Sequence, residues 1–127
     1  MKIILLTGKP NTGKTTTFNL LYSALANGIK NPPLKQGIGG KRTRDFECIF
    51  QYKGKKVALF SQGDIMYVIT GAIIKYSGIV DCLIIAHSRK GRIMDKIRLA
   101  VLANKQHCAI NKTRNNQNDC SQIIANI

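Results

Sequence analysis

The segment Gly8–Thr15, with the sequence GKPNTGKT, is the feature that most constrains how this chain folds. A short apolar run, Ile3–Leu6, precedes it, and a helical pattern follows it. The glycines allow the backbone to bend so that successive N–H groups point into one concavity, and the N-terminus of the following helix adds partial positive charge. We therefore predict a strand–loop–helix turn that binds a phosphate group.

The segment also matches the pattern G-x-x-x-x-G-K-[ST], and on these residues the chain resembles the P-loop NTPase superfamily. The resemblance implies that the loop binds a nucleoside triphosphate through the following residues: Gly8, Lys9, Pro10, Asn11, Thr12, Gly13, Lys14 and Thr15. Lys14 is expected to reach the β- and γ-phosphates, and the Thr15 hydroxyl is expected to bind Mg²⁺. Thr16 either contacts the α-phosphate or is an ordinary residue of the first helical turn.

Length and composition limit the classes of protein that the chain can belong to. Its 127 residues indicate a single domain, residues 1–127. The 20 basic and 6 acidic residues give a formal net charge of +14, which favours a polyanionic partner such as nucleic acid, unless the surface is simply basic throughout. No apolar run approaches the ~20 residues of a membrane span, so we expect a cytoplasmic protein. The four cysteines form no C-x-x-C pair, which argues against a zinc site. Cys48, Cys82 and Cys108 lie in apolar runs and are expected to be buried thiols.

Apolar patterns predict an alternation of strands and helices. Strands are expected at 2–7, 46–52, 55–61, 79–86 and 107–110, and helices at 14–27, from 64 to about 77, at 92–104 and at 119–126. This alternation predicts a three-layer α/β fold: a mainly parallel five-stranded sheet with helices on both faces. A turn at Lys53-Gly54 makes strands 46–52 and 55–61 an antiparallel hairpin. Residues 28–45, rich in proline and glycine, are expected to form an irregular loop with a switch or substrate-binding role.

Small GTPases of the P-loop superfamily have the same order of elements along the chain. This resemblance implies a definite arrangement of the strands in space. Across the sheet the expected order is 46–52, 55–61, 2–7, 79–86 and 107–110, which is 2-3-1-4-5 in strand numbers.

Six carboxylates are available for a metal or a general base. They are Asp45, Glu47, Asp64, Asp81, Asp95 and Asp119. Ligands of such sheets bind at the carboxyl ends of the parallel strands, so Asp81, at the start of a strand, should face the opposite end. Asp64 follows strand 55–61 and is predicted to bind Mg²⁺ or to act as a general base, with a helix N-cap as the alternative. Ser61 occupies the place where the family usually has its metal-binding Asp.

Further side chains are candidates for catalysis. Gln62 is predicted to orient an attacking water, as a Gln in that region does in GTPases, and Gly63 to offer an N–H to the γ-phosphate. Arg89 is predicted to neutralise phosphate charge. Weaker candidates are Thr43 at the metal, and Arg42 and Arg44, which either clamp a phosphorylated substrate or act as an arginine finger. After strand 79–86, His87 is a candidate proton carrier and Arg92 an alternative to Arg89. For each of them a structural or surface role is the alternative.

The base of the nucleotide is the least constrained part of the prediction. Asn111-Lys112-Thr113-Arg114 follows the last strand, where GTPases carry N-K-x-D. Arg114 replaces the Asp that accepts hydrogen bonds from guanine, and arginine has no acceptor. ATP is therefore expected, and GTP less so. A dimer or a partner protein is one way to complete the base pocket.

These observations predict an ATP- and Mg²⁺-dependent P-loop protein. Its reaction is either phosphoryl transfer to a small acceptor, for example a phosphorylated small molecule, or hydrolysis in a GTPase-like switch. A basic nucleic-acid-binding module regulated by nucleotide is the alternative from another class.

Overall fold

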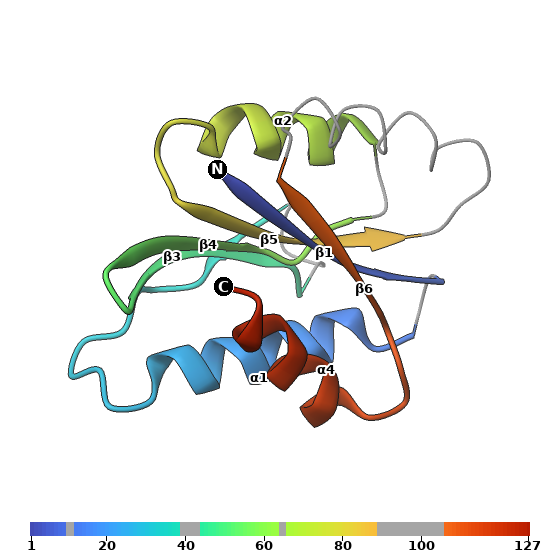
Figure 1. Cartoon of the computed structure of the whole chain (residues 1–127), viewed down its shortest axis with the longest axis horizontal. Coiled ribbons are helices and arrows are strands. Elements are labelled where there is room, and N and C mark those ends of the chain that lie inside the picture. The colour runs from blue at the N-terminus through green and yellow to red at the C-terminus, as the bar shows by residue number, and fades with distance from the viewer. Residues whose placement is uncertain (10–11, 39–43, 64–65, 89–105) are drawn as a thin grey trace.

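The computed structural model describes residues 1–9, 12–38, 44–63, 66–88 and 106–127. The elements are β1 (Lys2–Gly8), α1 (Lys14–Ala26), β2 (Gln36–Gly37), β3 (Phe46–Tyr52), β4 (Lys55–Phe60), α2 (Met66–Tyr76), β5 (Cys82–Ser88), β6 (His107–Asn111) and α4 (Asn116–Ala125). Helices α1 and α4 cover one face of the sheet and α2 covers the other, which confirms an α/β fold with helices on both faces (Figure 1).

The strands of the described residues form one six-stranded sheet in the order β2-β3-β4-β5-β1-β6. The pairs β4–β5, β5–β1 and β1–β6 are parallel, whereas β2–β3 and β3–β4 are antiparallel. The sheet is therefore mixed, and the prediction of a mainly parallel five-stranded sheet is wrong. The predicted order 2-3-1-4-5 is also wrong, because β5 lies between β4 and β1. Both β1 and β5 are buried along almost their whole length, so the hydrophobic pattern suits either interior position.

Strand β2 is additional to the five strands predicted from the sequence. It lies in the segment 28–45, which was expected to be irregular. It pairs Gln36 with Glu47 and Gly37 with Phe46. Both residues of β2 are exposed and the strand is only two residues long, so it has no hydrophobic alternation to reveal it.

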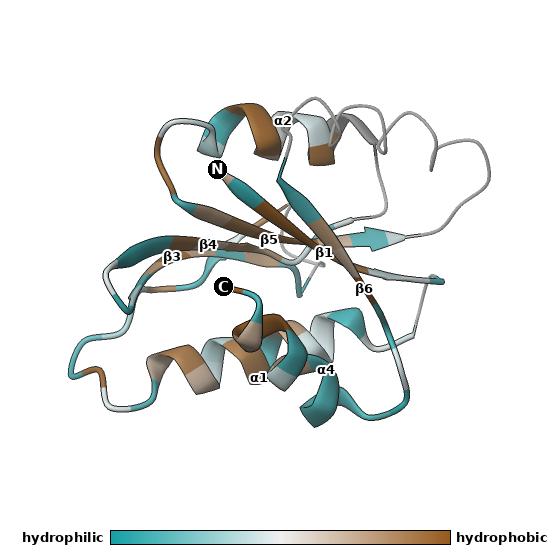
Figure 2. Ribbon diagram, viewed as in Figure 1, coloured by the Kyte–Doolittle hydropathy of each residue, from teal (hydrophilic) through white to brown (hydrophobic). Residues whose placement is uncertain are grey.

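Two apolar layers form the core, because alternate residues of a strand face opposite sides of the sheet. Ile4 and Leu6 of β1 pack towards α1 and α4, whereas Ile3 and Leu5 pack towards α2. The central strands β1 and β5 are accordingly among the most hydrophobic parts of the chain (Figure 2).

Several element boundaries differ from the predicted ones. The hairpin of β3 and β4 turns at Lys53-Gly54 as predicted, with positive φ at both residues. β5 begins at Cys82 rather than at Ile79. α4 begins at Asn116 rather than at Asp119, because the Asn115 side chain caps it by accepting a hydrogen bond from the N–H of Asn118 (2.9 Å). The predicted helix 92–104 lies outside the described residues. In the segments that are described, no helix has the length and apolarity needed to cross a membrane.

Candidate functional site

The loop from β1 into α1 lies at the carboxyl end of the parallel strands, as the sequence predicts. Gly13 has a φ of 86°, in the left-handed region that glycine adopts most readily. The chain then enters α1 at Lys14, and no side chain in the described residues caps this helix. The N-terminus of α1 therefore faces the loop with its positive dipole end, which favours an anion there.

Lys14 has its ammonium group inside this loop. The side chain is almost buried, and Nζ lies 2.7 Å from the carbonyl oxygen of Lys9 and 3.4 Å from that of Gly8. The cation is thus held where a phosphate on the loop would meet it.

A hydroxyl–carboxylate pair lies beside the lysine. The Thr15 hydroxyl donates to Oδ1 of Asp45 at 3.4 Å, and the Ser61 hydroxyl donates to the same oxygen at 3.1 Å. Ser61 also accepts a hydrogen bond from the N–H of Phe46 (2.8 Å), so its side chain links the end of β4 to the start of β3. These contacts fix the Asp45 carboxylate next to the first turn of α1.

Together these groups surround a pocket of about 120 Å³. Its lining consists of Thr12, Gly13, Lys14, Thr15, Asp45, Ser61 and Gly63. The lining combines a helix N-terminus, a cation, hydroxyls and one carboxylate, which is a set suited to phosphate and a hard cation.

Asp45 lines the pocket although the sequence pattern pointed to Asp64 as the metal-binding carboxylate. Asp64 lies outside the described residues. The signal for Asp45 was the predicted hairpin: because β3 runs antiparallel to β4, the residue before β3 lies at the same edge as the residues after β4. The Thr15 and Asp45 oxygens, 3.4 Å apart, are close to the spacing of about 3 Å between neighbouring ligands of an octahedral Mg²⁺.

The described residues contain no group of three or more His, Cys, Asp and Glu side chains that would hold a metal ion by itself. Mg²⁺ in nucleotide sites is usually held by one or two protein carboxylates, the phosphates and water. One carboxylate and one hydroxyl therefore fit this cation.

Gly63 comes close to the backbone of β5. A Cβ at this position would lie 2.0 Å from the carbonyl oxygen of Ala86, and the Gly63 carbonyl accepts a hydrogen bond from the N–H of Ser88 (2.9 Å). Gly63 and Ser61 both line the pocket, but Gln62 between them does not. The role of Gln62 in orienting water stays a prediction.

The other predicted site residues fall into two groups. Lys9, Thr12, Thr16 and Arg44 are exposed, and of these only Thr12 lines the pocket. Pro10, Asn11, Arg42, Thr43, Asp64, Arg89 and Arg92 lie outside the described residues.

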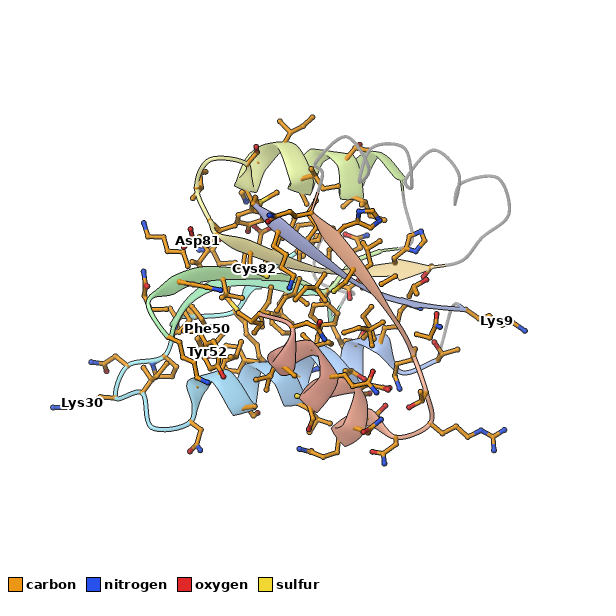
Figure 3. The ribbon with its side chains drawn as sticks, in the orientation of Figure 1. Lys9, Lys30, Phe50, Tyr52, Asp81 and Cys82 are labelled. Carbon is orange, nitrogen blue, oxygen red and sulfur yellow. The ribbon has the colours of Figure 1, made fainter. Side chains whose placement is uncertain are left out.

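His87 and Asp81 do not line the pocket. Nδ1 of His87 is 3.1 Å from the Thr7 hydroxyl, and by strand alternation both side chains belong to the α2 side of the sheet, opposite α1. Asp81 accepts a hydrogen bond from the N–H of Lys56 (2.8 Å) at the far end of the sheet from Lys9, as predicted (Figure 3).

Lys112 is a second residue whose place the sequence did not predict. Its Nζ lies 2.9 Å from Oδ2 of Asp119, and its aliphatic part lies against Gly8 and Gly13. A Cβ at Gly8 would be 2.9 Å from the Cβ of Lys112, and one at Gly13 would be 3.8 Å from its Cε. The Thr113 side chain also donates to Asp119 at 2.7 Å. Burial by itself would raise the pKa of Asp119, but these hydrogen bonds from Thr113 and Lys112 outweigh it and hold the pKa below its usual value.

Comparison of the chain with protein-family models, with curated proteins and with solved structures finds no match.

Proposed function

We propose that this protein binds a nucleoside triphosphate together with Mg²⁺ in the pocket between the loop Gly8–Thr15 and Asp45. One observation carries the proposal: Lys14, Thr15 and Asp45 converge on one pocket at a helix N-terminus. The buried ammonium supplies a cation for the terminal phosphates, and the adjacent hydroxyl and carboxylate supply oxygen ligands for the metal.

Each residue has a separate task in this proposal. The backbone around Gly13 and the start of α1 bind the phosphates, and Lys14 pairs with the β- and γ-phosphates. Thr15 and Asp45 hold Mg²⁺, which when bound neutralises charge on the phosphate oxygens. Ser61 orients Asp45 through its hydrogen bond to Oδ1.

We propose ATP rather than GTP as the nucleotide. Arg114 is exposed and offers no acceptor to a guanine ring. The nearby carboxylate, Asp119, is fully buried, and both of its oxygens accept hydrogen bonds from Lys112 or Thr113. Within the described residues no acidic side chain near this end of β6 is therefore left to recognise guanine.

The bound triphosphate is then either hydrolysed or transferred to a small acceptor. Gln62, Asp64 and Arg89 remain proposed contributors to this step.

Nucleotide-dependent thermal stabilisation tests the binding proposal. The Tm of the wild type should rise with ATP and Mg²⁺, less with GTP, and less again when EDTA removes the metal, since only ligands that bind the native state stabilise it. Lys14→Ala should abolish the shift, whereas Lys9→Ala, which changes an exposed lysine of the same loop, should keep most of it. An unchanged shift in Lys14→Ala contradicts the proposal, and a preference for GTP contradicts the choice of base.

Two further measurements separate the finer alternatives. Asp45→Asn and Asp64→Asn should be titrated with Mg²⁺ in the presence of ATP. A weakened Mg²⁺ dependence of ATP binding in Asp45→Asn alone supports Asp45 as the metal ligand. A weakened Mg²⁺ dependence in Asp64→Asn alone contradicts it. Labelled ATP with and without a panel of phosphorylated metabolites then distinguishes phosphoryl transfer from hydrolysis.

A further inference from the structure

An apolar groove lies away from the phosphate pocket, between β3 and the end of α2. It has a volume of about 450 Å³ and is lined by Pro33, Leu34, Gln36, Glu47, Cys48, Ile49, Lys75, Tyr76 and Ile79. Three of its apolar side chains are strongly exposed: Leu34 at 84%, Ile79 at 53% and Ile49 at 39%. Large apolar side chains gathered around one groove are typical of an interaction surface.

The backbone edge beside this groove is open. The N–H of Ser61 bonds to the carbonyl of Phe46, so Phe46 and every second residue after it pair with β4. Glu47, Ile49 and Gln51 therefore direct their backbone groups to the outer edge. There β2 pairs with Glu47 but ends before it reaches Ile49. In the described part of the chain, no strand pairs with the outward N–H and C=O groups of Ile49 and Gln51.

The residues preceding β2 do not extend its pairing along this edge, because they are hydrogen-bonded to side chains of α1. The carbonyl of Pro33 accepts a hydrogen bond from the Tyr22 hydroxyl (2.6 Å), and Lys35 donates to the Asn19 side chain (2.6 Å). Both partners belong to α1. Residues 33–35 therefore lean towards α1, and Leu34 is left at the rim of the groove.

Charge favours an acidic occupant at this edge. Within the groove Lys75 is paired with Glu47, but Lys35, next to Leu34, lies on the α1 side of the sheet with Nζ 4.7 Å from the centre of the Tyr22 ring, and the chain as a whole carries a net charge of +14. The acidic side chain in the lining is Glu47, and it is already engaged by Lys75 and Tyr76. A second copy of this chain would bring another net charge of +14 to a basic surface, which opposes self-association.

We propose that the edge of β3 at Ile49–Gln51 binds an extended segment of another protein in which apolar and acidic residues alternate. The segment adds as a strand in line with β2 and bonds to the outward backbone groups of Ile49 and Gln51. Its apolar side chains enter the groove between Leu34, Ile49 and Ile79, and its carboxylates, which alternate to the other face of the added strand, lie on the α1 side near Lys35.

The test uses the full chain and a fluorescein-labelled peptide of alternating valine and glutamate, with binding followed by fluorescence anisotropy. The wild type should bind this peptide, and added salt should weaken binding. A peptide with lysine in place of glutamate, and one with N-methylated backbone amides, should each bind at least about tenfold more weakly, because they lose the charge match or the backbone pairing. Equal binding of all three peptides contradicts the proposal.

Protein variants locate the binding surface. Leu34→Ser and Ile79→Ser remove apolar surface that is already exposed, so folding should be preserved, and each should weaken peptide binding about tenfold. Ile74→Ser is the matched control, because Ile74 is 77% exposed on α2 but does not line the groove. An equal loss in Ile74→Ser contradicts the proposal. So does a dimer, seen by sedimentation, that Leu34→Ser dissociates, since a second copy would then be the occupant.

Discussion

The ammonium of Lys112 lies 2.9 Å from Oδ2 of Asp119, and the two side chains are 1% and 0% exposed. Lys112 follows β6, and Asp119 lies in the first turns of α4. The aliphatic part of the Lys112 side chain lies against Gly8 and Gly13 of the β1–α1 loop. The ion pair thus connects the C-terminal helix to the loop that we propose binds phosphate, and the stability of one should depend on the other.

Replacement of Asp119 should be strongly destabilising. Asp119→Ala leaves the buried ammonium of Lys112 without its carboxylate, and breaking one half of a buried pair typically costs about 3–5 kcal/mol. Urea unfolding monitored by circular dichroism measures the loss. Gln122→Ala, on an exposed position of the same helix, should change the free energy of unfolding by less than about 0.5 kcal/mol. Similar effects of the two changes would mean that the pair does not stabilise the fold.

The same carboxylate should make stability depend on pH in the acid range. The native pKa of Asp119 is lower than the ordinary value of 3.8, so the unfolded chain takes up this proton at a higher pH than the native protein. The contribution of ionised Asp119 to the free energy of unfolding is complete above about pH 3.8 and is lost as the pH falls through the lower native pKa. The difference in unfolding free energy between the wild type and Asp119→Asn should therefore shrink below about pH 4. A difference that stays constant down to about pH 2 would contradict the lowered pKa.

Gly63 and Gly71 should respond to alanine in opposite directions. At Gly63 the new Cβ would lie 2.0 Å from the carbonyl oxygen of Ala86, so the tail of β4 must move, and we expect a loss of about 2 kcal/mol or more. At Gly71, inside α2, a Cβ meets nothing within 4 Å. There alanine should stabilise by about 0.5–1 kcal/mol through its higher helix propensity. Thermal and urea unfolding of Gly63→Ala and Gly71→Ala measure the two changes in the free energy of unfolding. Changes of the same sign and size would contradict the prediction.

The cysteines should differ in their reactivity towards a thiol reagent such as DTNB. Burial raises the pKa of Cys48 to about 12 and that of Cys82 to about 11, and it also raises the pKa of Cys120. Because the thiolate is the reactive form, these three thiols should react only as fast as the protein opens. Cys108 is only partly buried and should react first. Cys108→Ser should then remove the fast phase, and a fast phase of more than one thiol would contradict the burial.

The strand–loop–helix turn at Gly8–Thr15 and the β3–β4 hairpin could be predicted because their signals are local. A loop such as Gly8–Thr15 is specified by glycines at fixed spacing between a strand and a helix, and the hairpin by alternation on both sides of Lys53-Gly54. The short strand β2 could not be predicted, since two exposed residues have no pattern, and it forms only because the edge of β3 is there to pair with it.

The sequence by itself determined an α/β chain with a glycine-containing turn between its first strand and first helix, because strand and helix periodicity and glycine placement are properties of neighbouring residues. Tertiary structure decided that β5 lies between β4 and β1, since two strands buried on both faces are interchangeable in their apolar pattern. It also decided that Asp45 meets Thr15 and that Asp119 neutralises Lys112. These contacts depend on which strand ends and helix ends meet at the same edge of the sheet, and sequence separation carries no information about that.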